Sequence, residues 1–236
     1  MSNIIKKALI MAAGKGERLH PFTEFVPKAL IDIEGTPLID YSLNRLSGII
    51  ENIYITVGYK KEILLNHISN KGITRVIDTS KKGNSWWIFH SELKYIDEPV
   101  LVLPCDIITY IDLGFIKNEY EKLKLPICML VPIYPVSGVE GDYIHAEDKR
   151  VIDLSRENQT ALFCSGIQVI NPRKINEEMS TQIDFNQVWN KLIIKNKLYC
   201  SEYYPYSWYT INTEKQYNEV KNNIRKLNFI PQTTYR

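Results

Sequence analysis

The sequence predicts an α/β protein built on a doubly wound, mostly parallel β-sheet, with a β-hairpin added in its C-terminal half. Over roughly the first 110 residues, short apolar segments alternate with amphipathic segments of helical period, which is the pattern of βαβ units. Residues 100–103 form an uninterrupted apolar run, typical of a strand that is buried on both faces. Residues 142–154 alternate between polar and apolar types around Glu147-Asp148-Lys149, which indicates the hairpin.

The first half is expected to contain alternating strands and helices. Pro37 suits the first turn of a helix, because the N–H that proline lacks would have no helical partner there. Ile63, Leu64, His67 and Ile68 are assigned to the inner face of a second helix. The predicted strands are 8–11, 53–57, 75–77 and 100–103, and the predicted helices are one that opens at residue 37, then 60–68 and 86–95.

The second half is expected to contain longer strands and two helices. The predicted strands are 126–133, the hairpin 142–154, 165–170 and the aromatic-rich extended segment 203–211, and the helices are Phe185–Ile194 and 214–227. The sequence contains no internal repeat, no low-complexity stretch and no linker. We therefore expect a single domain over residues 1–236.

Composition limits the class of protein. The 236 residues are 44% apolar and 24% charged, with a net charge of +2, as in soluble globular proteins. No basic block is interleaved with aromatic residues, so nucleic-acid binding is not expected. No apolar run approaches ~18 residues and the N-terminus leads directly into the first strand, so we expect neither membrane association nor a signal peptide. The four cysteines are far apart and lack CxxC spacing, which favours free thiols and a cytoplasmic location.

A glycine-rich loop follows the first strand and reads AAGKGER over residues 12–18. Gly14 and Gly16 allow a tight bend that brings backbone N–H groups against phosphate oxygens. Arg18 and Lys28 supply two cations of different geometry, a planar fork and a point charge. The loop is neither a Walker A motif nor a dinucleotide fingerprint, whose third glycine position holds Leu19 here. This combination favours chemistry at phosphorus.

The loop followed by Pro27-Lys28 resembles the signature of nucleotidyltransferases that join NTPs to sugar phosphates or to phosphocholine-type alcohol phosphates. The resemblance extends over nearly the whole chain and is strongest in residues 8–46, where GTPLI at 35–39 also falls at family spacing. Residues 12–18 look most like the muramic acid 1-phosphate uridylyltransferase branch. The resemblance implies a Rossmann-like nucleotidyltransferase fold. It also implies a Mg²⁺-dependent reaction in which an acceptor phosphate attacks the α-phosphorus of an NTP and expels pyrophosphate.

The resemblance also implies roles for residues of the donor site. Arg18 would neutralise the departing pyrophosphate, and Lys28 would bridge the α-phosphate and the attacking phosphate. Asp106 would bind Mg²⁺, and its place just beyond a buried strand suits a ligand site. Asn212 stands where family members carry an acidic residue, so it is a second metal ligand, a water-mediated contact or only a helix N-cap before Glu214. The nucleotide is expected to contact Ala12, Ala13, Gly14, Lys15, Gly16, Glu17, Gly58 and Asn84.

The acceptor side is predicted with less detail, because the chain departs there from the family pattern. Adjacent Trp86 and Trp87 cannot both face the core of one helix, so either one lines a pocket or one is only partly exposed. Gly166 and Asp184 lie in segments that border the acceptor in the family. The usual Glu-Lys-Pro lysine is absent, and Arg156 is either its substitute or a solvated side chain.

These features favour a nucleotidyltransferase that couples UTP or CTP to a sugar 1-phosphate and forms an NDP-sugar for polysaccharide or cell-envelope synthesis. Two alternatives are a phosphocholine-like cytidylyltransferase, favoured by residues 84–87, and a nucleotide-binding homologue without catalysis, suggested by the missing second carboxylate. The expected partners are an NTP and a small phosphorylated acceptor. The sequence leaves the oligomeric state open, a homo-oligomer included.

Overall fold

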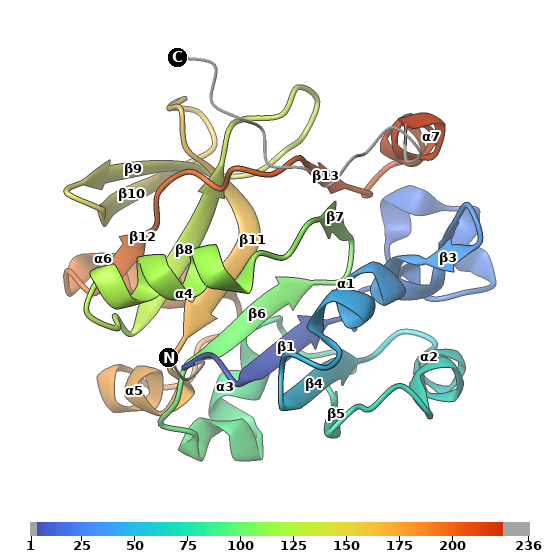
Figure 1. Ribbon diagram of the computed structural model, residues 1–236, viewed down its shortest axis with the longest axis horizontal. Helices are drawn as coiled ribbons and strands as arrows, with labels where there is room; N and C mark the ends of the chain where they lie inside the picture. Colours follow the sequence, from blue (N-terminus) through green and yellow to red (C-terminus); the bar gives the residue numbers. More distant parts are fainter. Residues whose placement is uncertain (1–3, 224–236) are drawn as a thin grey trace. The chain divides into compact units, whose positions relative to one another are not determined.

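The computed structural model describes residues 4–223, whose helices and strands are labelled in Figure 1. They divide into two compact units, each discontinuous in sequence. The described part of unit 1 contains residues 4–7, 82–102 and 112–204, and that of unit 2 contains residues 8–81, 103–111 and 205–223. The single domain predicted over residues 1–236 stays a prediction.

Unit 2 contains the parallel part of the sheet. Strand β4 (Asn52–Val57) pairs in parallel with β5 (Arg75–Asp78), and the strand order is β5-β4-β1 followed by β6. A separate antiparallel pair joins β7 (Ile107–Thr109) to β13 (Trp208–Thr210). The other elements of the unit are β1 (Lys7–Met11), β2 (Asp32–Ile33), β3 (Thr36–Pro37), α1 (Leu38–Leu46), α2 (Lys61–Ile68), α7 (Glu214–Asn223) and the 3₁₀ turns η1 (Glu17–Leu19), η2 (Phe22–Glu24) and η3 (Lys28–Leu30).

Unit 1 contains the mixed part of the sheet, in the order β6-β11-β8-β12-β10-β9. Strand β11 (Phe163–Ile170) is antiparallel to both β6 (Val100–Pro104) and β8 (Cys128–Ile133), whereas β12 (Leu198–Cys200) is parallel to β8. Strands β9 (Tyr143–Glu147) and β10 (Arg150–Ser155) form the predicted hairpin. The helical elements are α3 (Trp86–His90), η4 (Glu92–Tyr95), α4 (Leu113–Lys122), α5 (Pro172–Glu178) and α6 (Phe185–Ile194).

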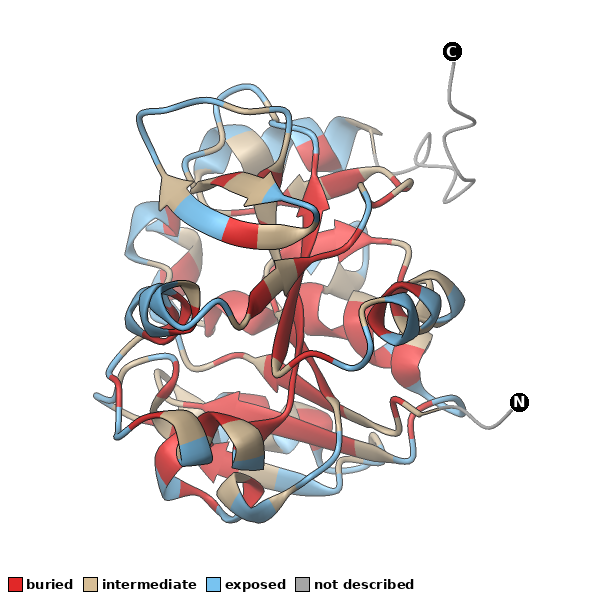
Figure 2. Cartoon of the chain, turned by 90° about the vertical axis from the view of Figure 1, so that its left-hand side faces the viewer, coloured by how far each residue is buried: buried red, intermediate tan, exposed pale blue. Residues whose placement is uncertain are grey.

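The strands form the core of each unit, as the burial colours in Figure 2 show. Every residue of β8 is buried, and so are the apolar residues 100–103 that were expected to be covered on both faces. A smaller apolar cluster in unit 2 joins the turns after the glycine loop to β7, β13 and α7. Its buried members are Leu19, Ile31, Ile33, Leu38, Ile108, Ile211 and Val220.

Two predicted helices differ from the structure. The helix expected over 86–95 is divided at Ser91, whose Oγ donates to the carbonyl of Trp87 at 2.6 Å and accepts from the N–H of Leu93 at 3.2 Å. These bonds close α3 and open η4. The second helix begins at Lys61 because Lys60 has a left-handed backbone (φ +50°).

The inner face predicted for the second helix is partly wrong. Leu64 and Ile68 are buried, but the Ile63 side chain is 41% exposed. His67 does face inward, where its Nε2 lies 3.0 Å from a carboxylate oxygen of buried Asp40 on α1. The last predicted helix, 214–227, begins at Glu214 as expected, and its residues from 224 lie outside the described part of the chain.

Candidate active site

The first part of the glycine loop is fixed to the carboxyl end of β4. The N–H of Ala12 donates to the carbonyl and to the Oγ1 of Thr56, at 3.2 and 3.1 Å, and the N–H of Tyr59 donates to the carbonyl of Ala13 at 3.1 Å. A Cβ at Gly58 would lie 2.6 Å from the carbonyl oxygen of Ala13, so only glycine allows this approach. The loop therefore begins at the edge of the sheet where α/β proteins bind ligands.

The second part of the loop packs on the stem of Lys28. Gly16 has a left-handed backbone (φ +64°), and a Cβ there would lie 3.1 Å from Lys28 Cβ and from Thr23 Cγ2. The Thr23 hydroxyl donates to the Gly16 carbonyl at 3.1 Å, and the N–H of Leu19 donates to the same carbonyl at 2.9 Å. The conformation of the loop and the path of the lysine side chain are thus coupled.

Lys28 presents its ammonium group to two oxygen-bearing side chains. The side chain emerges from η3 and is largely buried, with 11% of it exposed. Its Nζ donates to Oδ2 of Asp106 and, at 2.7 Å, to Oδ1 of Asn212. A cation, a carboxylate and an amide oxygen therefore meet at one point.

The short sheet of β7 and β13 brings Asp106 and Asn212 together. Thr210 lies opposite Ile107 in register, and the N–H of Ile211 donates to the carbonyl of Asp106 at 2.9 Å. Two strands of three residues each thus align segments that are distant in sequence.

Asn212 is not the cap of the last helix. The N–H of Gln216 bonds to the Oγ1 of Thr213 at 3.3 Å, which makes Thr213 the capping residue. The side chain of Asn212 instead donates through Nδ2 to Oγ1 of Thr210 at 2.7 Å and presents Oδ1 to Lys28. The N-cap alternative for Asn212 is therefore wrong.

An open cavity of about 600 Å³ lies against these groups, within the usual size of small-molecule sites. Among its lining residues, Lys15, Glu17 and Arg18 are exposed and Lys28 is buried. Burial of the neighbouring Cys105 thiol raises its pKa to about 12, so it adds no charge at neutral pH. The lining residues are Gly14, Lys15, Gly16, Glu17, Arg18, Lys28 and Asn212.

Unit 2 thus contains all of the predicted donor-site residues except Asn84, which belongs to unit 1. Thr23 and Thr56 were not predicted from the sequence, although their side chains fix the loop. Their hydroxyls bond to backbone groups seven and 44 positions away, and no spacing in the sequence signals such bonds.

The predicted acceptor-side residues belong to unit 1, as does Asn84, and two of them, together with Asn84, serve the structure around α6. Asn84 Oδ1 accepts from the N–H of Phe185 at 2.9 Å, and Asp184 caps the helix by accepting from the N–H of Gln187 at 2.9 Å. Trp87 is fully buried and its ring lies 6.5 Å from that of Phe185, so it is a core residue and does not line a pocket.

Trp86 and Gly166 remain accessible on unit 1. Trp86 is half-buried and stacks on exposed His90, with the ring centroids 4.9 Å apart. Gly166 has a φ of +83° at the point where β11 shifts register against β8. Arg156, with 68% of its side chain exposed, donates to Asp142 at 3.2 Å, as a solvated arginine would.

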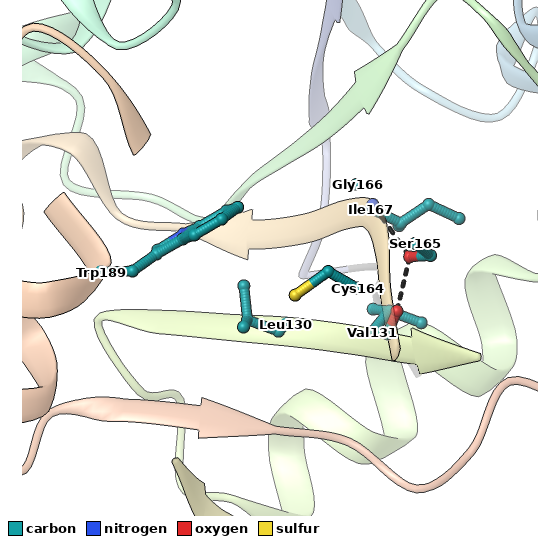
Figure 3. Close-up of a pocket in the computed structure, with 7 residues that line it drawn as sticks. All are labelled: Leu130, Val131, Cys164, Ser165, Gly166, Ile167 and Trp189. Carbon is teal, nitrogen blue, oxygen red and sulfur yellow. Dashed lines mark hydrogen bonds between the residues drawn. The ribbon is translucent and has the colours of Figure 1, made fainter. Parts of the chain in front are cut away.

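Figure 3 shows a small cavity beside Gly166. The Ser165 hydroxyl donates to the carbonyl of Val131 at 2.5 Å and accepts from the N–H of Ile167 at 3.0 Å, which holds the bend in β11. The ring of Trp189 flanks the cavity, and its Nε1 is anchored on Gln168 at 3.0 Å. The lining residues are Leu130, Val131, Cys164, Ser165, Gly166, Ile167 and Trp189.

A mixed, mostly parallel sheet with a glycine loop at its carboxyl edge is the arrangement of an α/β transferase fold of the nucleotidyltransferase type. The family model of the MobA-like NTP transferase domain matches residues 8–126. The chain belongs to this family.

Curated relatives carry names of sugar-nucleotide enzymes. UTP–glucose-1-phosphate uridylyltransferase AglF of Haloferax volcanii is 30% identical over 179 residues, which are 70% of this chain and 72% of that relative. Bifunctional protein GlmU of Methanococcus aeolicus is 35% identical over 115 residues, 49% of this chain, and the chain matches only 28% of the GlmU length.

Solved structures confirm the predicted fold. The inositol-1-phosphate CTP transferase of T. maritima superposes with a TM-score of 0.79 at 18% identity, covering 96% of this chain and 98% of the other. CTP:phosphocholine cytidylyltransferase LicC of Streptococcus pneumoniae superposes with a TM-score of 0.74 at 22% identity, covering 92% and 98%. Among residues 4–223, no helix combines the length and apolarity needed to cross a membrane.

Proposed function

We propose that this protein transfers a nucleotidyl group from an NTP to a sugar 1-phosphate, releasing pyrophosphate and forming an NDP-sugar. The observation that carries the proposal is the Lys28 ammonium, held between Asp106 and Asn212 beside the cavity of the glycine loop. The activity for which AglF is named supports the sugar 1-phosphate, and this relative is matched over 72% of its length.

The residues of unit 2 suit this reaction in charge and position. Backbone N–H groups near Gly14 and Gly16 would hold the triphosphate, and Arg18 would neutralise the pyrophosphate that leaves. Lys28 would balance the negative charge shared by the α-phosphate and the attacking phosphate. A phosphate monoester is anionic at neutral pH, so no general base is required, and the residues act by alignment and charge stabilisation.

The oxygen atoms at this centre fit Mg²⁺. Oδ2 of Asp106 and Oδ1 of Asn212 converge on the positive charge of Lys28, so the site is built around a cation. Residues 4–223 contain no cluster of three or more His, Cys, Asp or Glu side chains suited to a metal. A single carboxylate with an amide oxygen is nonetheless sufficient for Mg²⁺ that is bound mainly through phosphates. When bound, Mg²⁺ would neutralise phosphate charge.

For the nucleotide base and the acceptor, the proposal names chemical classes. A pyrimidine nucleotide, UTP or CTP, follows from the resemblance of Ala12-Ala13-Gly14 to uridylyl- and cytidylyltransferases. A phosphocholine-like acceptor is the second candidate, favoured by the resemblance of residues 84–87 to the corresponding segment of phosphocholine cytidylyltransferases. A cytoplasmic location and a role in polysaccharide or envelope synthesis complete the proposal.

Pyrophosphate release tests this function. The purified protein is incubated with each of the four NTPs against a panel of sugar 1-phosphates and phosphocholine, with Mg²⁺ and with EDTA. We expect release with UTP or CTP and one acceptor, abolished by EDTA and restored by excess Mg²⁺. Nucleotide binding without release in any combination would contradict the proposal and favour the inactive homologue.

A pair of lysine variants tests the role of the buried ammonium. Lys28→Met keeps the apolar stem and should reduce turnover about 10²–10³-fold, the usual effect of removing one charge-stabilising donor. Lys215→Met, at an exposed position on α7, is the matched control and should leave turnover unchanged. Equal turnover in both variants would show that Lys28 does not contact the reacting phosphates.

A further inference from the structure

We propose that Thr210 is a positioning residue that holds the Asn212 amide in place, with Oδ1 toward the Lys28 ammonium and toward the Mg²⁺ proposed for this site. With this orientation, an uncharged side chain serves as an oxygen ligand in place of a carboxylate. This role rests on the proposed function, because it concerns the cation and phosphate centre of that reaction.

An amide at this position must be oriented, because its two ends are alike in shape and opposite in polarity. The oxygen of an asparagine side chain accepts hydrogen bonds, whereas its NH₂ group only donates them. The Lys28 ammonium also only donates, so Oδ1 of Asn212 is the atom that lies 2.7 Å from it. A flipped amide would direct two N–H dipoles at a positive charge.

Thr210 supplies the acceptor that favours one orientation. Nδ2 of Asn212 donates to the Thr210 hydroxyl oxygen at 2.7 Å, so each end of the amide has a partner of the required kind. Thr210 is 6% exposed, which limits competition from water for this bond. Flipping the amide would break the bond from Lys28 and would require the Thr210 hydroxyl to rotate and donate to Oδ1.

The hydroxyl of Thr210 is itself held in place. Thr210 ends β13, where it pairs with Ile107 of β7, and a β-branched side chain has few χ1 rotamers. The next residue is fixed by its bond to the Asp106 carbonyl, and the N–H of Asn212 donates to Oε1 of Gln216 at 2.8 Å. Both the backbone and the amide of Asn212 are therefore preorganised.

Charge explains why orientation matters for this chain. Lys28 and Asp106 carry opposite unit charges and Asn212 carries none, so the three side chains are balanced without a metal ion. An aspartate at position 212 would add a negative charge and would present an oxygen in either rotamer. Thr210 should therefore matter when residue 212 is asparagine and matter much less when it is aspartate.

A double-mutant cycle tests this dependence. Thr210→Val removes the hydroxyl at nearly constant shape, and Thr210→Ser keeps it, each in the Asn212 and the Asn212→Asp backgrounds. The measured quantity is the affinity for Mn²⁺ in the presence of the α,β-methylene analogue of UTP, from the electron paramagnetic resonance signal of free Mn²⁺. Thermal melts confirm that each variant folds, and Thr210→Ala replaces the valine variant if the latter does not.

We expect Thr210→Val to weaken Mn²⁺ binding about tenfold with Asn212, the value of one neutral hydrogen bond, and Thr210→Ser to restore it to within about twofold. In the Asn212→Asp background, Thr210→Val should weaken Mn²⁺ binding by about threefold or less. Equal losses of Mn²⁺ affinity in both backgrounds would assign Thr210 a merely structural role. Unchanged Mn²⁺ affinity in both backgrounds would show that Thr210 does not orient the amide. If the cycle gives the expected coupling but no substrate pair releases pyrophosphate, the proposed function fails while the role of Thr210 stands.

Discussion

Replacing Gly16 with alanine tests whether the glycine loop and Lys28 form one packed unit. The left-handed backbone at this position (φ +64°) costs an L-residue about 1–2 kcal/mol. The added Cβ would lie 3.1 Å from Lys28 Cβ and from Thr23 Cγ2, so both neighbours must shift by a few tenths of an ångström. Overpacking of this kind costs about 1 kcal/mol or more. We therefore expect a total loss of about 2–3 kcal/mol in the free energy of unfolding.

Two other glycines of unit 2 are matched controls. Gly35 also has a left-handed backbone (φ +86°), but a Cβ there meets no atom within 4 Å, so Gly35→Ala should show the backbone cost alone. A Cβ at Gly14 likewise meets no atom within 4 Å, so Gly14→Ala should leave stability unchanged. Its methyl group would project from a residue that lines the cavity, and it should raise the KM for the NTP.

Thermal unfolding and pyrophosphate release measure the two consequences separately. For a chain of this size, about 1 kcal/mol corresponds to about 2–4 °C in Tm, so Gly16→Ala should melt at a clearly lower temperature than Gly35→Ala. Turnover should fall about tenfold or more in Gly16→Ala, because the ammonium of Lys28 is displaced, and should be unchanged in Gly35→Ala. Equal Tm values and wild-type turnover in Gly16→Ala would refute the packing of the loop against Lys28.

Two further predictions concern unit 1. Burial raises the pKa of Glu119, but hydrogen bonds from Lys122 and from the N–H of Glu202 outweigh burial and hold it below its ordinary value. The ionised carboxylate therefore stabilises the fold at any pH above its unfolded-state pKa of about 4.3, and this stabilisation is lost as the pH falls through its folded-state pKa. Glu119→Gln should consequently lower the free energy of unfolding by about 1 kcal/mol at pH 7. Urea titrations should show this difference at neutral pH and a progressively smaller one as the pH falls below the unfolded pKa, and a pH-independent difference would contradict the reasoning. In the same assay, Trp87→Ala should lower the free energy of unfolding by about 3–5 kcal/mol, because Trp87 is fully buried. Trp86 is half-buried, so Trp86→Ala should lower it by about 1 kcal/mol or less. Equal losses in the two variants would place both rings in the core.

Elements with a local signal were predicted accurately. Helix Phe185–Ile194 has the predicted bounds, because its cap at Asp184 and its apolar period both lie within the segment. Helix Leu113–Lys122 was not predicted, although Asp112 caps it by accepting from the N–H of Phe115 at 2.9 Å. The aspartate before an apolar run is a signal that could have indicated this helix.

Features that depend on distant contacts could not be read from the sequence. Periodicity requires that one of Trp86 and Trp87 face inward, but which one does so depends on packing against Phe185, far along the chain. The role of Lys28 was implied by the family resemblance, and that of Asp106 also by its place just beyond a buried strand, whereas their direct pairing could not be predicted. The Asn212 amide is oriented by β13, a strand of three residues that appeared only as part of a longer extended segment.

The discontinuity of unit 2 has a consequence for the synthesis of the protein. Lys28 and Asn212 are separated by 184 positions, and Asp106 lies between them in the chain. A ribosome therefore completes the glycine loop early, while the partners of the lysine are supplied much later, the last of them by the C-terminal segment. Until residue 212 has been made, the nascent chain lacks the complete cation centre through which nucleotide would stabilise the fold. If nucleotide binds there as proposed, ligand-dependent stability would distinguish finished chains from truncated ones, and proteolysis would act on that difference.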